Sequence, residues 1–263
     1  MWGGGVFEEP YRWTEAVGNR RAYVDAQLAQ GSPVVALSYR DGVVLATFQR
    51  GIPKLYEVYD RIALGGVGHP ADLEALRAAA LDMAHVEGFN RSPADVTAMR
   101  LIKYGLAPLA KRAYEELFRA PLIARVLLAQ VGARWGQDVL MTLDYDGTFE
   151  ETVGRAVLAA SDPSRRAMLA HLDGAGPWQE APLAAALPAA LRAWAVGELV
   201  HAAPEAPAPD DARLTQHLQA CGVDRRIEVA VLDRGAAGTS KYRSLTANEV
   251  SEFLVPWLGA AVR

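Results

Sequence analysis

The chain has 263 residues, of which 51% are hydrophobic, and a formal net charge of −4 at pH 7, which allows one large domain or two small ones. This balance offers no basic surface for nucleic acid, so no nucleic-acid partner is expected. No segment approaches the uncharged apolar run of about 18 residues that a membrane span needs, so no membrane association is expected. The first ten residues lack the basic and apolar regions of a secretory signal. With a single cysteine, Cys221, no internal disulfide can form, and a cytoplasmic location is expected.

The start of the chain divides into a tail and a helix. Residues 1–12 are rich in glycine and aromatic residues and show no periodicity, which is typical of a mobile tail. A helix is expected over 14–30, because Thr14 can cap it, Glu15 lies in its first turn and Gly31 can end it.

The segment 32–69 predicts a β-hairpin followed by a third strand. Apolar runs at 34–37 and 43–46 flank the Arg-Asp-Gly turn at 40–42, in which glycine accepts a positive φ and aspartate bonds its own backbone. Residues 59–67 are apolar at their centre and end in glycine-rich sequence, as a strand would. Because two-stranded hairpins are only marginally stable alone, a larger sheet and a covering layer are expected.

The rest of the chain is predicted to form alternating blocks of helices and strands. Apolar residues recur at helical spacing over 70–87 and 96–118, and Gly105 and Pro108 predict a kink in the second helix. The other expected elements are strands at 122–133, 138–144 and 153–159, helices at 162–171 and 182–200, a proline-rich loop at 203–211, one or two helical turns at 214–219, strands at 227–232 and 242–245, and a helix at 247–257. This order lacks a repeating βα unit, so it indicates an α+β fold with two antiparallel sheets between helix layers.

Several segments taken together are similar to one family. They are VVALSYRDGVVLATF, KLYEVYDRIALGGVG, FNRSPADVT, the Tyr145-Asp146-Gly147 turn and the late strand IEVAVLD. Over nearly its whole length the chain resembles proteasome α subunits, most closely those of bacterial 20S proteasomes of the actinobacterial type. The resemblance implies the four-layer αββα sandwich of N-terminal nucleophile hydrolases. It also implies one domain over 13–263, which includes the helix at 14–30, and a mobile gating tail over 1–12.

The resemblance also implies that the catalytic residues of this superfamily are missing. In the catalytic β subunits, a chain-terminal threonine is the nucleophile, its own α-amino group is the base, and an aspartate and a lysine tune it. In this chain Ser32 stands at the nucleophile position and Phe48 at the aspartate position, where a phenyl ring can neither orient an amine nor accept a proton. No catalytic residue is expected, and the active site of the complex would lie in a β subunit.

The same resemblance assigns binding roles. Lys54 matches the lysine that, in α subunits, lines a pocket between neighbours and receives the C-terminal carboxylate of an activator ATPase. Gly68 and His69 are assigned to this pocket, because the backbone of Gly68 can be approached closely. Gating is assigned to the tail residues Trp2, Val6 and Phe7. The implied assembly is a heptameric outer ring of this chain that stacks on β subunits, gates substrate passage and docks a ring-shaped ATPase.

Two alternatives stay open: a divergent self-processing hydrolase with Ser32 as nucleophile, and a ring-forming scaffold without a protease partner. No cofactor is expected, because the glycine-rich run 65–68 lacks the lysine and hydroxyl residue of a phosphate-binding loop. The histidines are scattered and not at ligand spacing with an acid or with Cys221, so no metal site is expected and Cys221 is interpreted as a packing residue. The five histidines are His69, His85, His171, His201 and His217.

Overall fold

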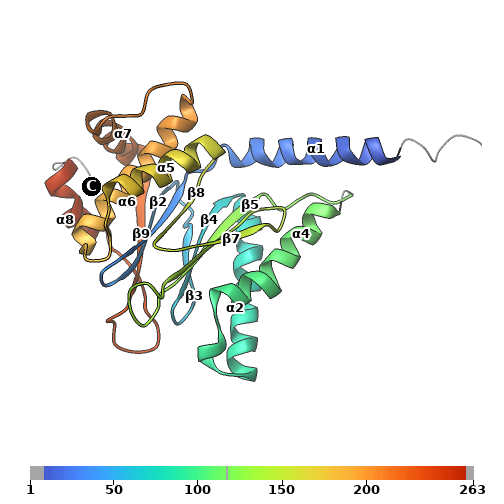
Figure 1. Ribbon diagram of the computed structural model, residues 1–263, viewed down its shortest axis with the longest axis horizontal. Helices are drawn as coiled ribbons and strands as arrows, with labels where there is room; N and C mark the ends of the chain where they lie inside the picture. The colour runs from blue at the N-terminus through green and yellow to red at the C-terminus, as the bar shows by residue number, and fades with distance from the viewer. Residues whose placement is uncertain (1–8, 117, 259–263) are drawn as a thin grey trace, which may run out of the picture.

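The chain folds into two five-stranded antiparallel sheets that lie between two layers of helices (Figure 1). The fold is taken from a computed structural model, which describes residues 9–116 and 118–258. One sheet has the strand order β10-β9-β2-β1-β8 and the other the order β3-β4-β5-β6-β7. The expected α+β sandwich is confirmed. The strands are β1 (Val34–Tyr39), β2 (Gly42–Gln49), β3 (Leu55–Tyr59), β4 (Ile62–Gly68), β5 (Ala124–Gln130), β6 (Val139–Leu143), β7 (Phe149–Thr152), β8 (Arg155–Leu158), β9 (Arg226–Asp233) and β10 (Tyr242–Ser244).

The helices cover the outer faces of both sheets. Those near the middle of the chain cover the sheet that contains β4, and those of the C-terminal third cover the sheet that contains β1 and β2. The helices are α1 (Glu9–Leu28), α2 (Pro70–Asn90), the short η1 (Pro93–Asp95), α3 (Ala98–Arg100), η2 (Leu101–Leu106), α4 (Ala107–Glu115), α5 (Asp162–Ala175), α6 (Leu183–Ala202), α7 (Asp211–Asp224) and α8 (Ala247–Leu258).

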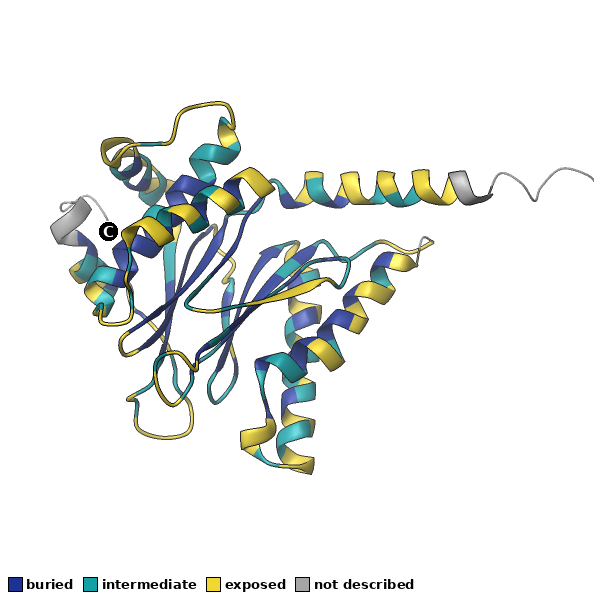
Figure 2. Cartoon of the chain, in the orientation of Figure 1, coloured by how far each residue is buried: buried dark blue, intermediate teal, exposed yellow. Residues whose placement is uncertain are grey.

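Side-chain alternation along β1 explains why the sheets are buried on both faces. Val35 and Leu37 pack in the core formed with α5, α6 and α7, whereas Val34 and Ala36 pack against the other sheet. All residues of β1 and β2 are therefore buried, and Figure 2 shows the central strands of the two sheets as largely buried. This double burial accounts for the continuous apolar runs, which replace the alternation of a half-exposed sheet.

The strand expected at 59–67 is confirmed over 62–67 as part of β4, but its start is wrong and the preceding strand β3 was missed. The structure has a second hairpin there, in which β3 and β4 pair on either side of Asp60 and Arg61. A turn without glycine or proline carries no breaker signal, so the sequence pattern concealed it. The exposed strand β7 was also missed, because its sequence, Phe-Glu-Glu-Thr, is mostly polar.

Gly42 occupies its turn for a reason other than the expected one. It is not among the glycines with positive φ, so the predicted left-handed conformation is wrong. A Cβ on Gly42 would instead lie 1.9 Å from the carbonyl oxygen of Leu232 in β9. Only glycine allows β2 and β9 to approach this closely at the end of their ladder.

Two helices depart from the sequence expectations in an informative way. The irregularity expected around Gly105 and Pro108 takes the form of a π-helical segment, η2, which contains Gly105 and ends just before Pro108. A Cβ on Gly105 would lie 2.4 Å from Met83 Sδ of α2. Helix α6, within the described part of the chain, is long and apolar enough to cross a membrane, contrary to the expectation for any segment. However, 61% of that apolar window is buried inside the fold, as in a core helix.

Helix α1 begins at Glu9 and ends at Leu28, earlier at both ends than the expected 14–30. It projects from the body of the molecule, and only its C-terminal part reaches the sheets (Figure 1). Val24 and Leu28 are fully buried there, whereas Trp13 is 54% exposed. The residues expected to form the gating tail, Trp2, Val6 and Phe7, lie outside the described residues.

Candidate functional site

Ser32 lies in the short connection between α1 and β1. Its nitrogen is in a peptide bond with Gly31, where a Cβ would lie 2.3 Å from Val67 Cγ1, so α1 ends tightly against β4. Its hydroxyl oxygen accepts a hydrogen bond from Trp194 Nε1 at 3.0 Å. An indole N–H only donates and cannot take a proton from the hydroxyl. Because its nitrogen is in a peptide bond, Ser32 also lacks the free amine that serves as base in N-terminal nucleophile chemistry.

Phe48, at the position of the missing aspartate, is a core residue of β2. Its side chain is 1% exposed, and its ring centroid lies 4.1 Å from that of Trp194 on α6. The Phe48 ring therefore belongs to the core between β2 and α6. A phenyl ring in this core position offers no group that could orient an amine or accept a proton.

Lys54 lies at the start of β3, and its side chain turns toward Ser32. Lys54 Nζ donates a hydrogen bond to the carbonyl oxygen of Ser32 at 3.1 Å, so the ammonium binds the backbone of this residue. Burial lowers the pKa of Lys54 to about 8, because desolvation disfavours the charged ammonium. The charges that act on it are Glu228 and Glu198, which oppose this shift, and Arg225 and Arg50, which add to it.

Glu228 on β9 holds the backbone around Lys54. Its carboxylate accepts hydrogen bonds from the backbone nitrogens of Lys54, at 2.9 and 3.1 Å, and of Leu55, at 3.0 Å. Burial raises the pKa of Glu228 even though these hydrogen bonds favour its charged form. Glu228 was not among the residues predicted from the sequence, where its one visible signal is a carboxylate within the apolar strand IEVAVLD.

Gly68 and His69 lie at the end of β4, where they start helix α2. Gly68 has φ +139°, and a Cβ there would lie 2.0 Å from the carbonyl oxygen of Ile123. His69 is exposed, donates its backbone N–H to the same carbonyl at 2.7 Å, and caps α2 through Nδ1, which accepts from Ala71 N at 3.3 Å. Both residues therefore have local structural roles. Their hydrogen bonds are separate from that of the Lys54 ammonium, which binds the carbonyl oxygen of Ser32.

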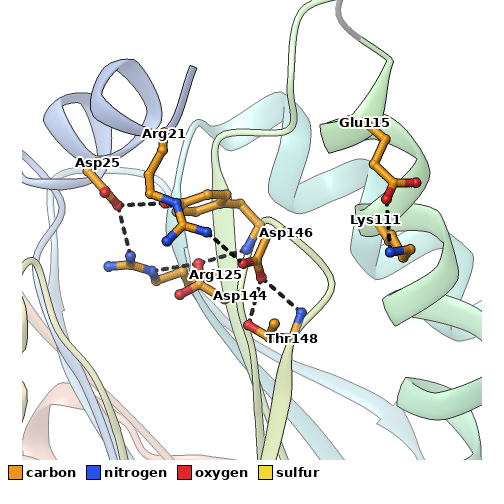
Figure 3. A network of polar contacts seen from close by, with 9 residues as sticks. Arg21, Asp25, Lys111, Glu115, Arg125, Asp144, Asp146 and Thr148 are labelled. Carbon is orange, nitrogen blue, oxygen red and sulfur yellow. Dashed lines mark hydrogen bonds and ion pairs between the residues drawn. The ribbon is translucent and has the colours of Figure 1, made fainter. Parts of the chain in front are cut away.

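A polar network holds α1 on the sheets (Figure 3). Arg125 of β5 donates to Asp25 of α1 at 3.1 Å and to Asp144, after β6, at 2.9 Å. The Tyr145 hydroxyl also donates to Asp25, at 3.0 Å, so one carboxylate of α1 binds two groups of the second sheet. The arginine side chain is 18% exposed, which limits solvent screening of its contacts.

A second set of contacts joins α1 to the end of α4. The guanidinium of Arg20 donates to the carbonyl oxygens of Ala113, Glu116 and Arg119, at 2.8 to 3.2 Å. These are carbonyls at and beyond the end of a helix, which have no intrahelical donor and favour a cation. The sequence analysis missed Arg20, Asp25 and Arg125, although a charged residue in the apolar strand 124–130 was a visible signal.

The interpretation of Cys221 as a residue with no local partner is wrong. His217 and Cys221 lie one turn apart on α7, and Cys221 Sγ is 3.5 Å from His217 Nε2. The sequence pattern placed only 214–219 in helix, so the helical spacing of these two residues was not recognised. Glu198 of α6 completes a cluster with them, and its carboxylate accepts a hydrogen bond from Arg225 at 2.6 Å.

Comparison with known proteins agrees with this architecture. The family model described as "Proteasome subunit" matches residues 28–171, more than half of the chain. The chain belongs to the proteasome subunit family. The match begins at the end of α1 and ends within α5, so it contains Ser32, Phe48, Lys54, Arg125 and Asp144, whereas Asp25 lies before it.

Within this family, the chain is similar to bacterial α subunits. The proteasome subunit alpha of Actinosynnema mirum is 31% identical over 181 residues, which cover 68% of this chain and 66% of that protein. That of Kineococcus radiotolerans is 30% identical, over 81% of this chain and 83% of the relative. The proteasome subunit alpha of Pseudarthrobacter chlorophenolicus is 31% identical, over 82% of this chain and 84% of that protein. The expected similarity to α subunits is confirmed, and this proteasome-family chain is of the α type.

Proposed function

We propose that this chain is a non-catalytic subunit of a 20S proteasome-like core particle in the cytoplasm. Seven copies would form an outer ring stacked on catalytic β subunits, which would carry the endopeptidase site. The observation that carries the proposal is the attachment of α1: the helix precedes Ser32 in the chain by a short connection and is bound to the sheets through Asp25 and Arg125. A chain that keeps this helix cannot present Ser32 as an N-terminal nucleophile.

Peptidase assays on the purified chain, alone and together with a β partner, test this proposal. We expect no activity from the chain alone and activity from the complex that is unchanged by Ser32→Ala. Peptidase activity of the chain alone that disappears in Ser32→Ala would overturn the proposal and favour a self-processing hydrolase. Failure to form any complex with a β chain would favour a ring-forming scaffold.

Docking of a ring-shaped ATPase is assigned to the surroundings of Lys54, with Gly68 and His69. A lysine ammonium is suited to capture a C-terminal carboxylate, and Lys54 is partly exposed at the start of β3. We expect Lys54→Ala to abolish ATPase-stimulated degradation while ring assembly, measured by size-exclusion chromatography, persists. The matched control is Lys103→Ala, which replaces an exposed lysine on η2. Undiminished stimulation in Lys54→Ala would reject the docking assignment.

Gating is assigned to the tail that precedes α1, including Trp2, Val6 and Phe7. The apolar residues of this tail can pack against neighbouring copies, and its three consecutive glycines allow it to move. Deletion of residues 2–7 should increase the rate at which the assembled complex cleaves a peptide without an activator. A rate equal to that of the full-length complex would contradict the gating role.

A further inference from the structure

A cluster of three potential metal ligands lies where α6 packs on α7. One oxygen of Glu198, one nitrogen of His217 and the sulfur of Cys221 lie within 4.8 Å of one another. His217 and Cys221 are on the same face of α7, one turn apart, and Glu198 faces them from α6. Sites of this kind, built from facing helices, are common in helical layers, because the helices hold the ligands in place.

The geometry of the cysteine–histidine pair suits a tetrahedral metal. With a Zn–S distance of about 2.3 Å and a Zn–N distance of about 2.0 Å, two ligands at a tetrahedral angle lie about 3.5 Å apart. Cys221 Sγ and His217 Nε2 are 3.5 Å apart, the same separation. A thiolate, an imidazole and a carboxylate together favour zinc over magnesium or calcium, which prefer oxygen ligands alone.

The residues around the cluster hold its ligands in place but leave the cluster accessible to a metal ion. The His217 ring stacks on the fully buried Trp194, with centroids 5.9 Å apart, which limits rotation of the imidazole. Glu198 Oε2 accepts from Arg225 Nη1, and a carboxylate has a second oxygen that can bind a metal at the same time. His217 and Cys221 are each partly exposed, so a metal ion can reach them.

We propose that Glu198, His217 and Cys221 form a three-residue binding site for a zinc-type divalent ion, with a fourth position open to water. In the metal-free chain, the thiol–imidazole contact and the Glu198–Arg225 ion pair satisfy the same groups, so folding does not require the metal. Binding releases the thiol proton and brings the Glu198 carboxylate toward the other two ligands. The site is independent of the function proposed above.

Cobalt is the first probe. The full-length chain, freed of metal with a chelator, is titrated with Co²⁺, which occupies zinc sites and reports its ligands by absorption. We expect one equivalent of Co²⁺ to bind, with a near-ultraviolet thiolate-to-cobalt band and the visible bands of four-coordinate cobalt, and Zn²⁺ to displace it. The thiolate band should disappear in Cys221→Ser. His201→Gln, on α6 and outside the cluster, is the matched control and should leave the spectrum unchanged.

Alkylation of the only cysteine gives a second readout on the wild-type chain. Zn²⁺ should slow the reaction of Cys221 with a thiol reagent at least tenfold, and His217→Gln should remove most of this protection. Absence of both the thiolate band and the protection in the wild-type chain would overturn the proposal, whatever the variants do. Stoichiometric Zn²⁺ binding that Cys221→Ser and His217→Gln leave unchanged would overturn it too, because the metal would then be bound elsewhere.

Discussion

Arg125 Nη2 donates to Asp25 Oδ1 at 3.1 Å, and this bond ties the helix that precedes the first strand to the middle of the second sheet (Figure 3). The same guanidinium also binds Asp144, so one arginine serves both the helix and the turn after β6. The position of α1 therefore depends in part on Arg125, a residue 100 positions further along the chain than Asp25.

Replacing Arg125 should release α1. Arg125→Met leaves the carboxylates of Asp25 and Asp144 without their cation, so we expect a loss of about 1 to 3 kcal/mol in the free energy of unfolding. Amide hydrogen exchange should become faster in the C-terminal half of α1. Lys111→Met, which breaks an exposed pair with Glu115, is the control and should change stability by less than about 0.5 kcal/mol. Equal effects of both variants in urea denaturation would contradict this account of the network.

Truncation of Phe48 should be among the more damaging substitutions. Phe48→Ala removes a ring that is 1% exposed and packs on Trp194, so it should cost about 3 to 5 kcal/mol. Phe149→Ala, in the exposed strand β7, removes a ring that is 43% exposed and should cost less than about 1 kcal/mol. Chemical denaturation of the two variants measures the difference. A similar loss at both positions would mean that Phe48 is not a core residue.

Gly42 and Gly18 differ in the space around them, so substitution by alanine should have opposite effects on stability at the two positions. Gly42→Ala should cost about 1 to 3 kcal/mol, because the new methyl group would overlap the carbonyl oxygen of Leu232. Gly18, within α1, has no neighbouring atom within 4 Å of an added Cβ. Gly18→Ala should therefore stabilise α1 by about 0.5 to 1 kcal/mol through helix propensity. Urea denaturation measures the loss of stability in Gly42→Ala. Circular dichroism measures whether Gly18→Ala increases the helix content. A neutral Gly42→Ala would refute the close approach of β2 and β9.

The stability of the fold should depend on pH through Lys54. Its pKa is about 8 in the folded chain and about 10.5 when unperturbed, so the unfolded chain binds the proton more tightly. Wild-type stability, relative to Lys54→Met, should therefore be lowest below pH 8 and should rise as the pH increases from 8 toward 10.5. Lys54→Arg should not show this rise, because a guanidinium stays protonated over this range. A difference that is constant over this range would mean that Lys54 is not desolvated.

Much of the fold could be predicted from the sequence, because most elements carry a strong local pattern. The apolar runs on either side of Asp41 gave the first hairpin, and the helical spacing over 70–87 gave α2 with its start at Pro70. The second hairpin was lost because Asp60 and Arg61 form its turn without a glycine or proline. Local patterns cannot reveal a turn whose residues have no special backbone preference.

The candidate site was predictable only in part, since its contacts join distant segments. The sequence singled out Ser32, Phe48 and Lys54, but Trp194, which contacts two of them, lies far away in an alanine-rich helix. Likewise, the spacing of His217 and Cys221 has meaning only if α7 continues to Asp224. The first feature depends on how α6 packs on β1 and β2 and the second on where α7 ends, and the local sequence pattern showed neither.

The intact mass of the purified chain tests the central claim most directly. A subunit that keeps α1 attached to Ser32 should show, alone and after assembly with a β partner, a mass that includes the segment before Ser32. A mass corresponding to a chain that starts at Ser32 would contradict the account, because Ser32 would then have the free α-amino group of a matured N-terminal nucleophile.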